Sequence, residues 1–343
     1  MIAIHFDNKD DFSTSWVAYC EKNGVPFKLV NCYENDIFEQ LDGCDCLLWH
    51  IENFDYREQI FAKFLIKSLE EKQIKTFPNY DTVWHYDDKV AQKYLLESVN
   101  APLAKSYVFY SEKEARSWAK QTSYPKVFKL RKGSGSKNVL LAKSFKQADK
   151  LISKAFSKGF PTLDMKVILK ERIRKYKNKK ESLLGVMKGI VRLFIGVPFR
   201  NMSPNEMGYA YFQDFLPGND HDQRIIVIGN RAIGLKRMVR DNDFRASGSG
   251  NFFYDRELFD EEFVKIAFEL NRKLNFQSMA YDFVYDQKGK PKIVEISYCF
   301  NKVVYYDCPG YWDEQLNWHE TKVIPEEWMV EDLIKNLNAH VSS

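Results

Sequence analysis

Asp282 and Glu295 are the residues whose types and spacing most directly suggest chemistry. The segments around them, 279–285 and 292–297, alternate with the two-residue period of a strand, and the polar link between the segments has turn composition. We assume that Tyr285 pairs with Lys292. The two acids then lie directly opposite each other, with Cβ atoms about 4.5–5.5 Å apart, where like charges repel. A divalent cation with oxygen ligands is the natural counter-charge. The alternative is an exposed hairpin edge where water solvates both acids.

A second segment has the composition of a phosphate-binding turn. Two short apolar segments, 127–130 and 139–142, are typical of strands, and Lys129 lies on the first. The glycine-serine turn between them contains Gly133, Ser134, Gly135 and Ser136. Backbone N–H groups of such a turn can bind phosphate oxygens. The turn is neither a Walker A loop, because GxxxxGK[ST] is absent, nor a Rossmann fingerprint, because a strand follows it. A plain hairpin turn is the alternative.

Residues 1–80 alternate between strand and helix patterns, which predicts a small parallel sheet. The expected strands are 2–6, 27–32 and 46–50, and the expected helices are 12–22 and 57–73. Ligands bind beyond the carboxyl ends of parallel strands. His5, Asp7 and His50 follow those ends, so they are candidate substrate contacts. The alternative is that they are loop polar residues or hydrogen-bonded structural histidines.

The composition is that of an ordinary globular protein. A length of 343 residues allows two or three domains, and 51 basic against 47 acidic residues give a net charge of +4, too small to suggest nucleic-acid binding. The N-terminus has no signal-peptide pattern, and no apolar run approaches the roughly 18 residues of a transmembrane helix. Six scattered cysteines without metal-binding spacing favour reduced thiols in the cytoplasm. We therefore expect a cytoplasmic protein.

Two stretches are less easily placed. Residues 165–208 interrupt the alternation with a densely basic run, 170–181, and an apolar run, 183–197, which predict an amphipathic or inserted element. A basic run is usually a solvated face; the alternative is a docking patch for an anionic partner such as a phosphorylated or lipid-linked sugar. The tail, 302–343, is rich in aromatic residues, which suit either sugar binding or burial. These residues are Tyr305, Tyr306, Tyr311, Trp312 and Trp318.

Seven short motifs follow one another between residues 78 and 301. They are Pro78-Asn79, Asp88-Lys89, Val127-Phe128-Lys129, Gln213-Asp214-Phe215, Asp222-Gln223-Arg224, Asp243-Phe244-Arg245 and Asp282 with Glu295-Ile296-Ser297. This order resembles the ATP-grasp superfamily, most closely its RimK-type and glutathione-synthetase-like ligases. The resemblance implies an α/β chain, α+β in its grasp domains, with the ATP-grasp fold and a Rossmann-like domain before it. The domains expected are 1–80, 81–211 with the insertion, and 212–343 with the metal site.

The resemblance also implies roles for individual residues. Lys89 and Lys129 would contact ATP phosphates, the loop 133–138 would close over them, and Asp214 to Leu216 would present backbone groups to adenine. The residues implied in cofactor binding are Lys89, Lys129, Gly133, Ser134, Gly135, Ser136, Gln213, Asp214, Phe215, Leu216 and Lys236. Arg224 and Arg245 would be catalytic, neutralising charge on the transferred phosphoryl group.

The metal ligands implied for Mg²⁺ or Mn²⁺ are Asp282, Glu295 and Ser297. Ser297 departs from the family, which has asparagine there, so Asn301 is an alternative third ligand. Asp214 stands where glutamate is common, a small change because backbone groups do most of the adenine recognition.

The resemblance implies an ATP-dependent carboxylate–amine ligase that forms an amide through an acylphosphate. Its substrates would be small-molecule carboxylates and amines, and our finer hypothesis joins an amino acid to a sugar in surface-polysaccharide biosynthesis. The alternatives are a RimK-type enzyme that extends a peptide or protein tail, an ATP-grasp phosphotransferase without an amine acceptor, and a nucleotide-binding regulator without turnover. The sequence does not determine the oligomeric state.

Overall fold

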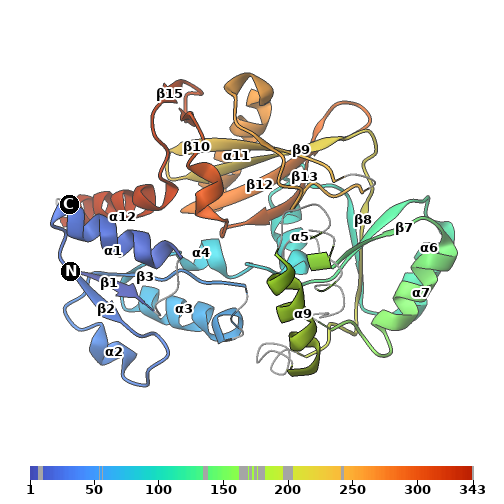
Figure 1. Cartoon of the computed structure of the whole chain (residues 1–343), viewed down its shortest axis with the longest axis horizontal. Helices are drawn as coiled ribbons and strands as arrows, with labels where there is room; N and C mark the ends of the chain where they lie inside the picture. The colour runs from blue at the N-terminus through green and yellow to red at the C-terminus, as the bar shows by residue number, and fades with distance from the viewer. Residues whose placement is uncertain are drawn as a thin grey trace.

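The computed structural model describes residues 1–6, 11–53, 55, 57–133, 138–161, 169, 172–173, 176, 182–195, 204–240 and 243–341. Within these ranges the chain forms three sheets, each in a lobe of its own (Figure 1). We call these the N-terminal, central and C-terminal lobes. The C-terminal lobe lies between the other two along the long axis, and both chain ends lie toward the outer side of the N-terminal lobe.

The N-terminal lobe contains the parallel sheet predicted for residues 1–80. Its strands lie in the order β2-β1-β3-β4, and every neighbouring pair is parallel. Their bounds are β1 Ile2–His5, β2 Phe27–Val30, β3 Cys46–Leu48 and β4 Lys75–Phe77. The helices are α1 Phe12–Asn23, α2 Ile37–Gln40, the π-helix η1 Glu58–Ala62, α3 Lys63–Glu71 and α4 Tyr80–Val83. The apolar segments form strands here because they are short and buried, with helices packed on them.

The central lobe contains an antiparallel sheet of order β5-β8-β6-β7. The predicted hairpin is confirmed, because β6 Lys126–Lys129 pairs with β7 Val139–Ala142 and Lys129 lies opposite Val139. The remaining strands are β5 Ser106–Phe109 and β8 Ala210–Asp214, so Gln213 and Asp214 belong to this sheet. The helices are α5 Lys89–Ser98, α6 Glu112–Gln121 and α7 Phe145–Ala155.

The C-terminal lobe contains a sheet of order β13-β12-β9-β10-β14-β15, with β11 paired to β10. Its strands are β9 His221–Ile228, β10 Arg231–Met238, β11 Phe252–Phe253, β12 Ser278–Tyr285, β13 Pro291–Ser297, β14 Gly310–Asp313 and β15 Trp318–Glu320. Its helices are α11 Glu261–Lys273 and α12 Pro325–Val341, with 3-10 turns η2 Arg256–Leu258 and η3 Lys302–Tyr305. The tail aromatics Tyr305 and Trp312 are buried in this lobe, so burial explains both.

The buried apolar clusters show which lobes pack together. One buried cluster contains Trp16 of the N-terminal lobe together with Ile226 of the C-terminal lobe, and a second cluster also joins these two lobes. The central lobe has its own cluster, formed by residues such as Phe128, Ile152 and Phe212. The N- and C-terminal lobes are therefore one packed body, and the central lobe is a second body beside it.

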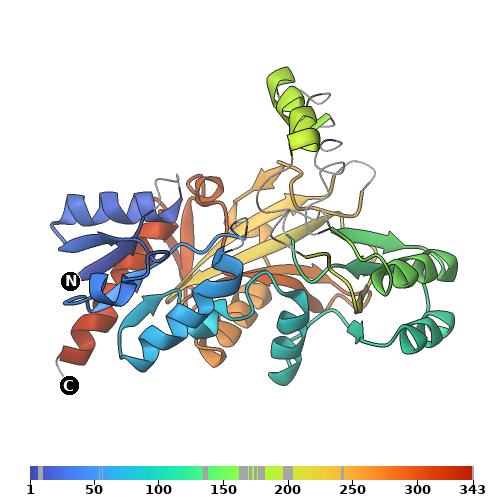
Figure 2. The ribbon, with the colours of Figure 1, turned by 90° about the horizontal axis from the view of Figure 1, so that it is seen from below.

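The predicted inserted element contains helix α9, Leu183–Ile195, which stands away from both bodies (Figure 2). Among the helices in the described ranges, none combines the length and apolar character that crossing a membrane requires.

Candidate functional site

The site is built around the two carboxylates on neighbouring strands. Asp282 of β12 lies directly opposite Glu295 of β13, as predicted. The register assumed for the hairpin is wrong by one residue, however, because Tyr285 pairs with Pro291 and not with Lys292. A β-bulge between these positions restores the pairing of the two acids, since Val294 has no opposite residue on β12.

Arginine side chains surround the buried Asp282. Arg224 of β9, directly opposite it, donates from Nε to Oδ1 at 2.5 Å and from Nη2 to Oδ2 at 2.8 Å. Arg237 of β10 lies 2.8 Å from the same Oδ2 and also bonds both oxygens of Asp222 at 2.7 Å. Burial acts to raise the pKa of Asp282, but the two arginines outweigh it and hold that pKa well below its usual range.

The prediction from sequence missed Arg237. The signal was present in the β9–β10 hairpin. Counting outward along both strands from the Gly229-Asn230 turn pairs Arg237 with Asp222. The same register places Lys236 opposite Gln223, on the other face of the sheet from Arg224. The structure thus brings Arg237 into the cluster and leaves Lys236, half-buried, outside it.

Two buried lysines approach Glu295 from the central lobe. Asp88 accepts hydrogen bonds from the N–H groups of Val90 and Ala91, so it caps α5 and positions Lys89 in the first turn. The Nζ of Lys89 lies 3.0 Å from Oε1 of Glu295 and donates to the carbonyl of Gly133 at 2.8 Å. Lys129 of β6 donates to the carbonyl of Val294 at 2.9 Å. The carbonyl of the bulge residue Val294 therefore accepts a hydrogen bond that joins the central lobe to the C-terminal lobe.

These contacts set the charge states of the lysines and Glu295. Burial lowers the pKa of Lys129 to about 8, and the positive charge of Lys89 acts in the same direction. Burial also acts against the charged form of Lys89, but Glu295 and Asp87 raise its pKa above the ordinary value. Burial would raise the pKa of Glu295, yet the two lysines hold it below its usual range. At neutral pH the cluster therefore consists of ionised groups.

The predicted adenine-binding segment lies at the end of β8. Gln213 is buried and donates to Ser106 Oγ at 3.1 Å, and Asp214 accepts from Lys126 Nζ at 2.5 Å. A cavity of about 140 Å³ borders this segment. Its lining includes Val127, Lys129, Gln213, Asp214, Phe215, Leu216, Phe244, Arg245, Asp282 and Glu295. The segment, one strand lysine and both carboxylates thus face a single slot.

The remaining predicted positions divide into three groups. Arg245 lines the slot and pairs with Asp243 at 2.6 Å. Gly133 has a positive φ of 117° and donates to the carboxylate of Asp87. The predicted phosphate-loop residues Ser134, Gly135 and Ser136 lie outside the described residues, as does Asp7.

The alternative third metal ligands are both bound to backbone groups. Ser297 donates from Oγ to the carbonyl of Cys299 at 2.8 Å. Asn301 caps η3, where its side chain accepts from the N–H of Val303 at 3.2 Å. Both line a second, larger cavity, so the choice between them stays open.

The larger cavity, about 520 Å³, begins where the slot ends. Both cavities are lined by Asp282, Glu295 and Ser247. The opposite wall of the larger cavity comes from the N-terminal lobe and includes Asp11, His50 and Glu52. The carboxylate pair therefore stands at the junction of two cavities, one bordered by the segment at the end of β8 and one by the carboxyl ends of the parallel strands.

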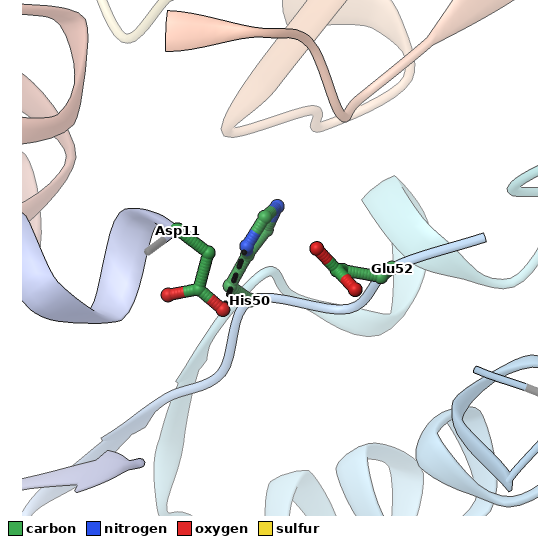
Figure 3. A group of neighbouring side chains, drawn as sticks. All are labelled: Asp11, His50 and Glu52. Carbon is green, nitrogen blue, oxygen red and sulfur yellow. Dashed lines mark ion pairs between the residues drawn. The ribbon is translucent and has the colours of Figure 1, made fainter. Parts of the chain in front are cut away.

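The N-terminal wall is acidic with one histidine (Figure 3). Asp11 Oδ2 lies 3.2 Å from His50 Nδ1, and the carboxylate of Glu52 faces the same space. His50 also contacts Cys299 Sγ through Nε2 at 3.2 Å. Burial opposes protonation of His50, but Cys299 and Asp11 outweigh it and raise its pKa to about 10. One ligand atom from each of Asp11, His50 and Glu52 lies within 4.8 Å of the others, so the group has the spacing of a cation-binding set.

His50 therefore reaches the cavity, as expected from its place at a strand end. His5 does not share this position, because it packs between the rings of Tyr33 and Trp49 and accepts from the N–H of Cys32 at 3.1 Å. It is a hydrogen-bonded structural histidine, which was the alternative interpretation.

No model of a known protein family matches the chain, and no curated protein matches it in sequence. Solved structures do match it over nearly its whole length. A RimK domain ATP-grasp protein from Sphaerobacter thermophilus is 12% identical, with a TM-score of 0.54 over 96% of this chain and 98% of the other. D-cycloserine synthetase is 11% identical, with a TM-score of 0.58 over 98% and 99%. D-alanine–D-alanine ligase from Bacillus anthracis, complexed with ATP, is 11% identical, with a TM-score of 0.53 over 87% and 85%.

Proposed function

We propose that this chain, which has the ATP-grasp fold, is an ATP-dependent carboxylate–amine ligase. The observation that carries the proposal is the junction of the two cavities at Asp282 and Glu295. A nucleotide in the smaller cavity and a substrate in the larger one would meet at the carboxylates, where Lys89, Lys129, Arg224 and Arg237 gather positive charge. This arrangement suits phosphoryl transfer from one cavity to the other.

The nucleotide would lie with adenine against residues 213–216 and phosphates toward the two lysines. The slot is lined by apolar side chains such as Val127 and Leu216, which suit a planar base. Lys129 lines the slot, and Lys89 pairs with Glu295, which also lines it, so both lysines would neutralise phosphate oxygens.

The donor set at the junction fits Mg²⁺ or Mn²⁺. Asp282 and Glu295 present carboxylate oxygens from opposed positions of a hairpin, and magnesium is usually held by one or two carboxylates together with phosphate oxygens. These two residues would hold the ion, with Ser297 or Asn301 as the proposed third ligand. When bound, the ion would supply charge neutralisation between phosphate groups.

The proposed reaction has two steps, formation of an acylphosphate and then formation of the amide. A carboxylate oxygen of the first substrate attacks the γ-phosphorus of ATP, the bond to the β-phosphate oxygen breaks, and ADP leaves. An amine nitrogen then attacks the acyl carbon, the C–N bond forms, phosphate leaves with the C–O electron pair, and the amine loses a proton to solvent. Arg224, which lines the larger cavity, and Arg245, which lines the slot, would stabilise the negative charge on the acylphosphate, while the protein orients the substrates.

The amine would enter along the N-terminal wall. Asp11 and Glu52 line this side of the larger cavity, and their carboxylates suit an ammonium group before it loses its proton. The acylphosphate would form on the opposite side, next to Arg224. An amine near Asp11 and Glu52 and an acylphosphate near Arg224 would then face each other in one cavity, which supports a reaction between an amine and an acid.

We further propose that one substrate is a carboxylated or amino sugar, which the enzyme joins to an amino acid. A volume of about 520 Å³ is enough for a monosaccharide and a small amine. The lining offers amide groups of Asn53, Gln92 and Asn301 and the rings of Phe12 and Tyr86, a mixture that suits sugar hydroxyls and sugar faces.

The test is release of ADP and phosphate across a matrix of carboxylates and amines with Mg²⁺ present. We expect turnover that requires one member of each class and an amide product. A stable phosphorylated product without consumption of amine would instead identify a phosphotransferase, and ATP binding without turnover would identify a regulator. Turnover with peptide acceptors but with no sugar would leave the ligase proposal standing and overturn the sugar substrate.

A further inference from the structure

Helix α9 carries a continuous apolar face in contact with solvent. Five large side chains on it are between 43% and 69% exposed, namely Leu183, Leu184, Met187, Ile190 and Val191. Their spacing of one, four, seven and eight residues from the first places them within an arc of about 120° on one side of the helix. A contiguous group of this kind differs from scattered exposed apolar residues and marks an interaction surface.

The opposite side of the helix explains why these residues face outward. Gly185 and Gly189 are buried, and a Cβ at Gly189 would lie 3.0 Å from Cδ of Arg172 and 3.1 Å from Cδ1 of Leu169. Arg172 also donates from Nη1 to the carbonyl of Gly185 at 2.6 Å. The glycine side therefore packs closely against Arg172 and Leu169, and this packing turns the apolar arc toward solvent.

The chain in and before the helix is mainly basic. Helix α9 contains Lys188 and Arg192 and no acidic residue, and Lys188 is exposed beside the arc. The sequence from 170 to 181, KERIRKYKNKKE, contains seven lysines and arginines and two glutamates. An apolar helix face in a basic part of the chain suits a surface that is apolar inside and anionic outside.

We propose that α9 binds the surface of a membrane containing anionic lipids. Its apolar arc would enter the boundary between headgroups and acyl chains, and the basic residues would contact anionic headgroups. The helix has 13 residues, a length of roughly 20 Å against a hydrocarbon core of roughly 30 Å, so it would lie in the plane of the interface. Figure 2 shows α9 standing away from the three sheets, where a flat surface can reach it.

This inference does not depend on the proposed ligase activity. Among the described residues that line the two cavities of the candidate site, none belongs to α9. Vesicle binding is measured without nucleotide or substrate, so a failure of membrane binding and a failure of catalysis are separate results. Together, the two proposals would place the reaction at a membrane surface.

The experiment is co-sedimentation of the full chain with vesicles made from equal parts of phosphatidylcholine and phosphatidylglycerol. We expect binding to these vesicles and at least about tenfold weaker binding to phosphatidylcholine alone, because the basic residues then have no anionic lipid. The double variant L184E/M187E should lower the partition coefficient about a hundredfold, since each change puts a carboxylate into the apolar face. K188E should lower it about tenfold through charge alone.

The matched control is the double variant L29E/F38E in the N-terminal lobe. Leu29 and Phe38 are 49% and 43% exposed, so the control makes the same kind of change at a distant surface, and its binding should equal that of the wild type. Circular dichroism verifies that each variant is folded. Unchanged binding of L184E/M187E would overturn the proposal, as would wild-type protein that stays in the supernatant. The wild-type protein that stays in the supernatant could be a dimer that L184E/M187E converts to a monomer. That result would show that a second copy of the chain covers the apolar face of α9.

Discussion

At the residue scale, the site is a cluster of interacting charges. The cations are Lys89, Lys129, Arg224 and Arg237, and the anions are Asp87, Asp222, Asp282 and Glu295. Every carboxylate in this group interacts with a cation, which a charge removed from water requires. The hydrogen-bond partner of Lys129 is a neutral carbonyl oxygen, so this lysine brings positive charge toward an anionic ligand such as a nucleotide.

Replacing Glu295 by glutamine should remove turnover and leave nucleotide binding largely intact. The amide keeps the size of the side chain but loses the charge that pairs with Lys89 and that would hold the metal ion. We expect ADP release to fall by at least about a hundredfold, measured with saturating Mg²⁺, and the ATP dissociation constant to change much less. Glu262→Gln on the exposed start of α11 is the control. Unchanged turnover in E295Q would refute the metal assignment.

The low pKa of Lys129 predicts that ATP binding weakens in alkaline solution. Only the protonated lysine attracts phosphate, and its pKa of about 8 means that the charge is lost as the pH rises through 8. The dissociation constant measured by calorimetry should therefore be level below about pH 7 and rise above pH 8 by up to about tenfold per unit.

The control for this pH dependence is Lys129→Arg, because a guanidinium stays charged throughout that range. Its ATP affinity should not change between pH 7 and pH 9. The unfolded state binds more protons than the folded state between pH 8 and the ordinary lysine pKa, so wild-type stability should rise over that interval while affinity falls. Affinity and stability that fall together would contradict the assignment.

Arg237 should matter more for stability than its neighbour Lys236. It is buried and bonds Asp222 and Asp282 at once, so Arg237→Lys removes the paired geometry that two carboxylates use. We expect urea unfolding to show a loss of about 3 kcal/mol. Lys236→Gln, on the other face, should stay within about 0.5 kcal/mol of the wild type. Equal losses in the two variants would show that Arg237 has no special role in the folded cluster.

At the element scale, the start of α5 holds Lys89 in place. Asp88 caps the helix through two backbone N–H groups and pairs with Arg131 at 3.0 Å. The β-bulge at Val294 does the same for Lys129 by offering it a carbonyl. Both lysines are thus fixed by a local backbone feature and not by side-chain packing alone.

Substitutions at Asp88 separate the cap from the ion pair. Asp88→Asn keeps a capping oxygen and loses the charge, so we expect a loss in unfolding free energy of less than about 1 kcal/mol. Asp88→Ala loses both and should cost about 1 kcal/mol more than the asparagine variant. Urea denaturation measures both values. Equal losses in the two variants would mean that the cap contributes nothing.

At the scale of the whole molecule, the N- and C-terminal lobes share buried clusters, and the central lobe has a core of its own. The two cavities of the site use residues from more than one lobe. A ligand that fills the cavities would add contacts between the central lobe and the packed body formed by the other two lobes. Ligand binding should therefore stabilise the fold as a whole.

A non-hydrolysable ATP analogue with Mg²⁺ should raise the unfolding temperature. At a ligand concentration a hundred times the dissociation constant, the gain is about 2.7 kcal/mol. Addition of EDTA should reverse most of this shift, because the carboxylates would then face the phosphates without a cation between them. A thermal melt with and without chelator measures the effect. A shift that EDTA leaves unchanged would show that no metal takes part in nucleotide binding.

The sequence by itself determined the order of the motifs, the parallel sheet of residues 1–80, and the placement of Asp282 and Glu295 on two adjacent strands, although the direct pairing of the two acids depends on the bulge. These features follow from local patterns: the two-residue period of a strand, short apolar segments and the composition of turns. The role of Arg237 was also within reach, since hairpin register follows from the turn between β9 and β10. Lys236, which the resemblance implied in cofactor binding, lies on the other face of the sheet.

Only the tertiary structure decided the remainder. The bulge at Val294 shifts the hairpin register and supplies the acceptor for Lys129, and a strand pattern does not reveal one extra residue. Asp11, His50 and Glu52 meet the carboxylate pair across one cavity because long-range packing joins the N- and C-terminal lobes. Part of the expected apolar run, from Leu183 to Val191, forms an exposed face for a related reason. Which side of a helix is buried depends on its neighbours, and the glycines of α9 pack against Arg172.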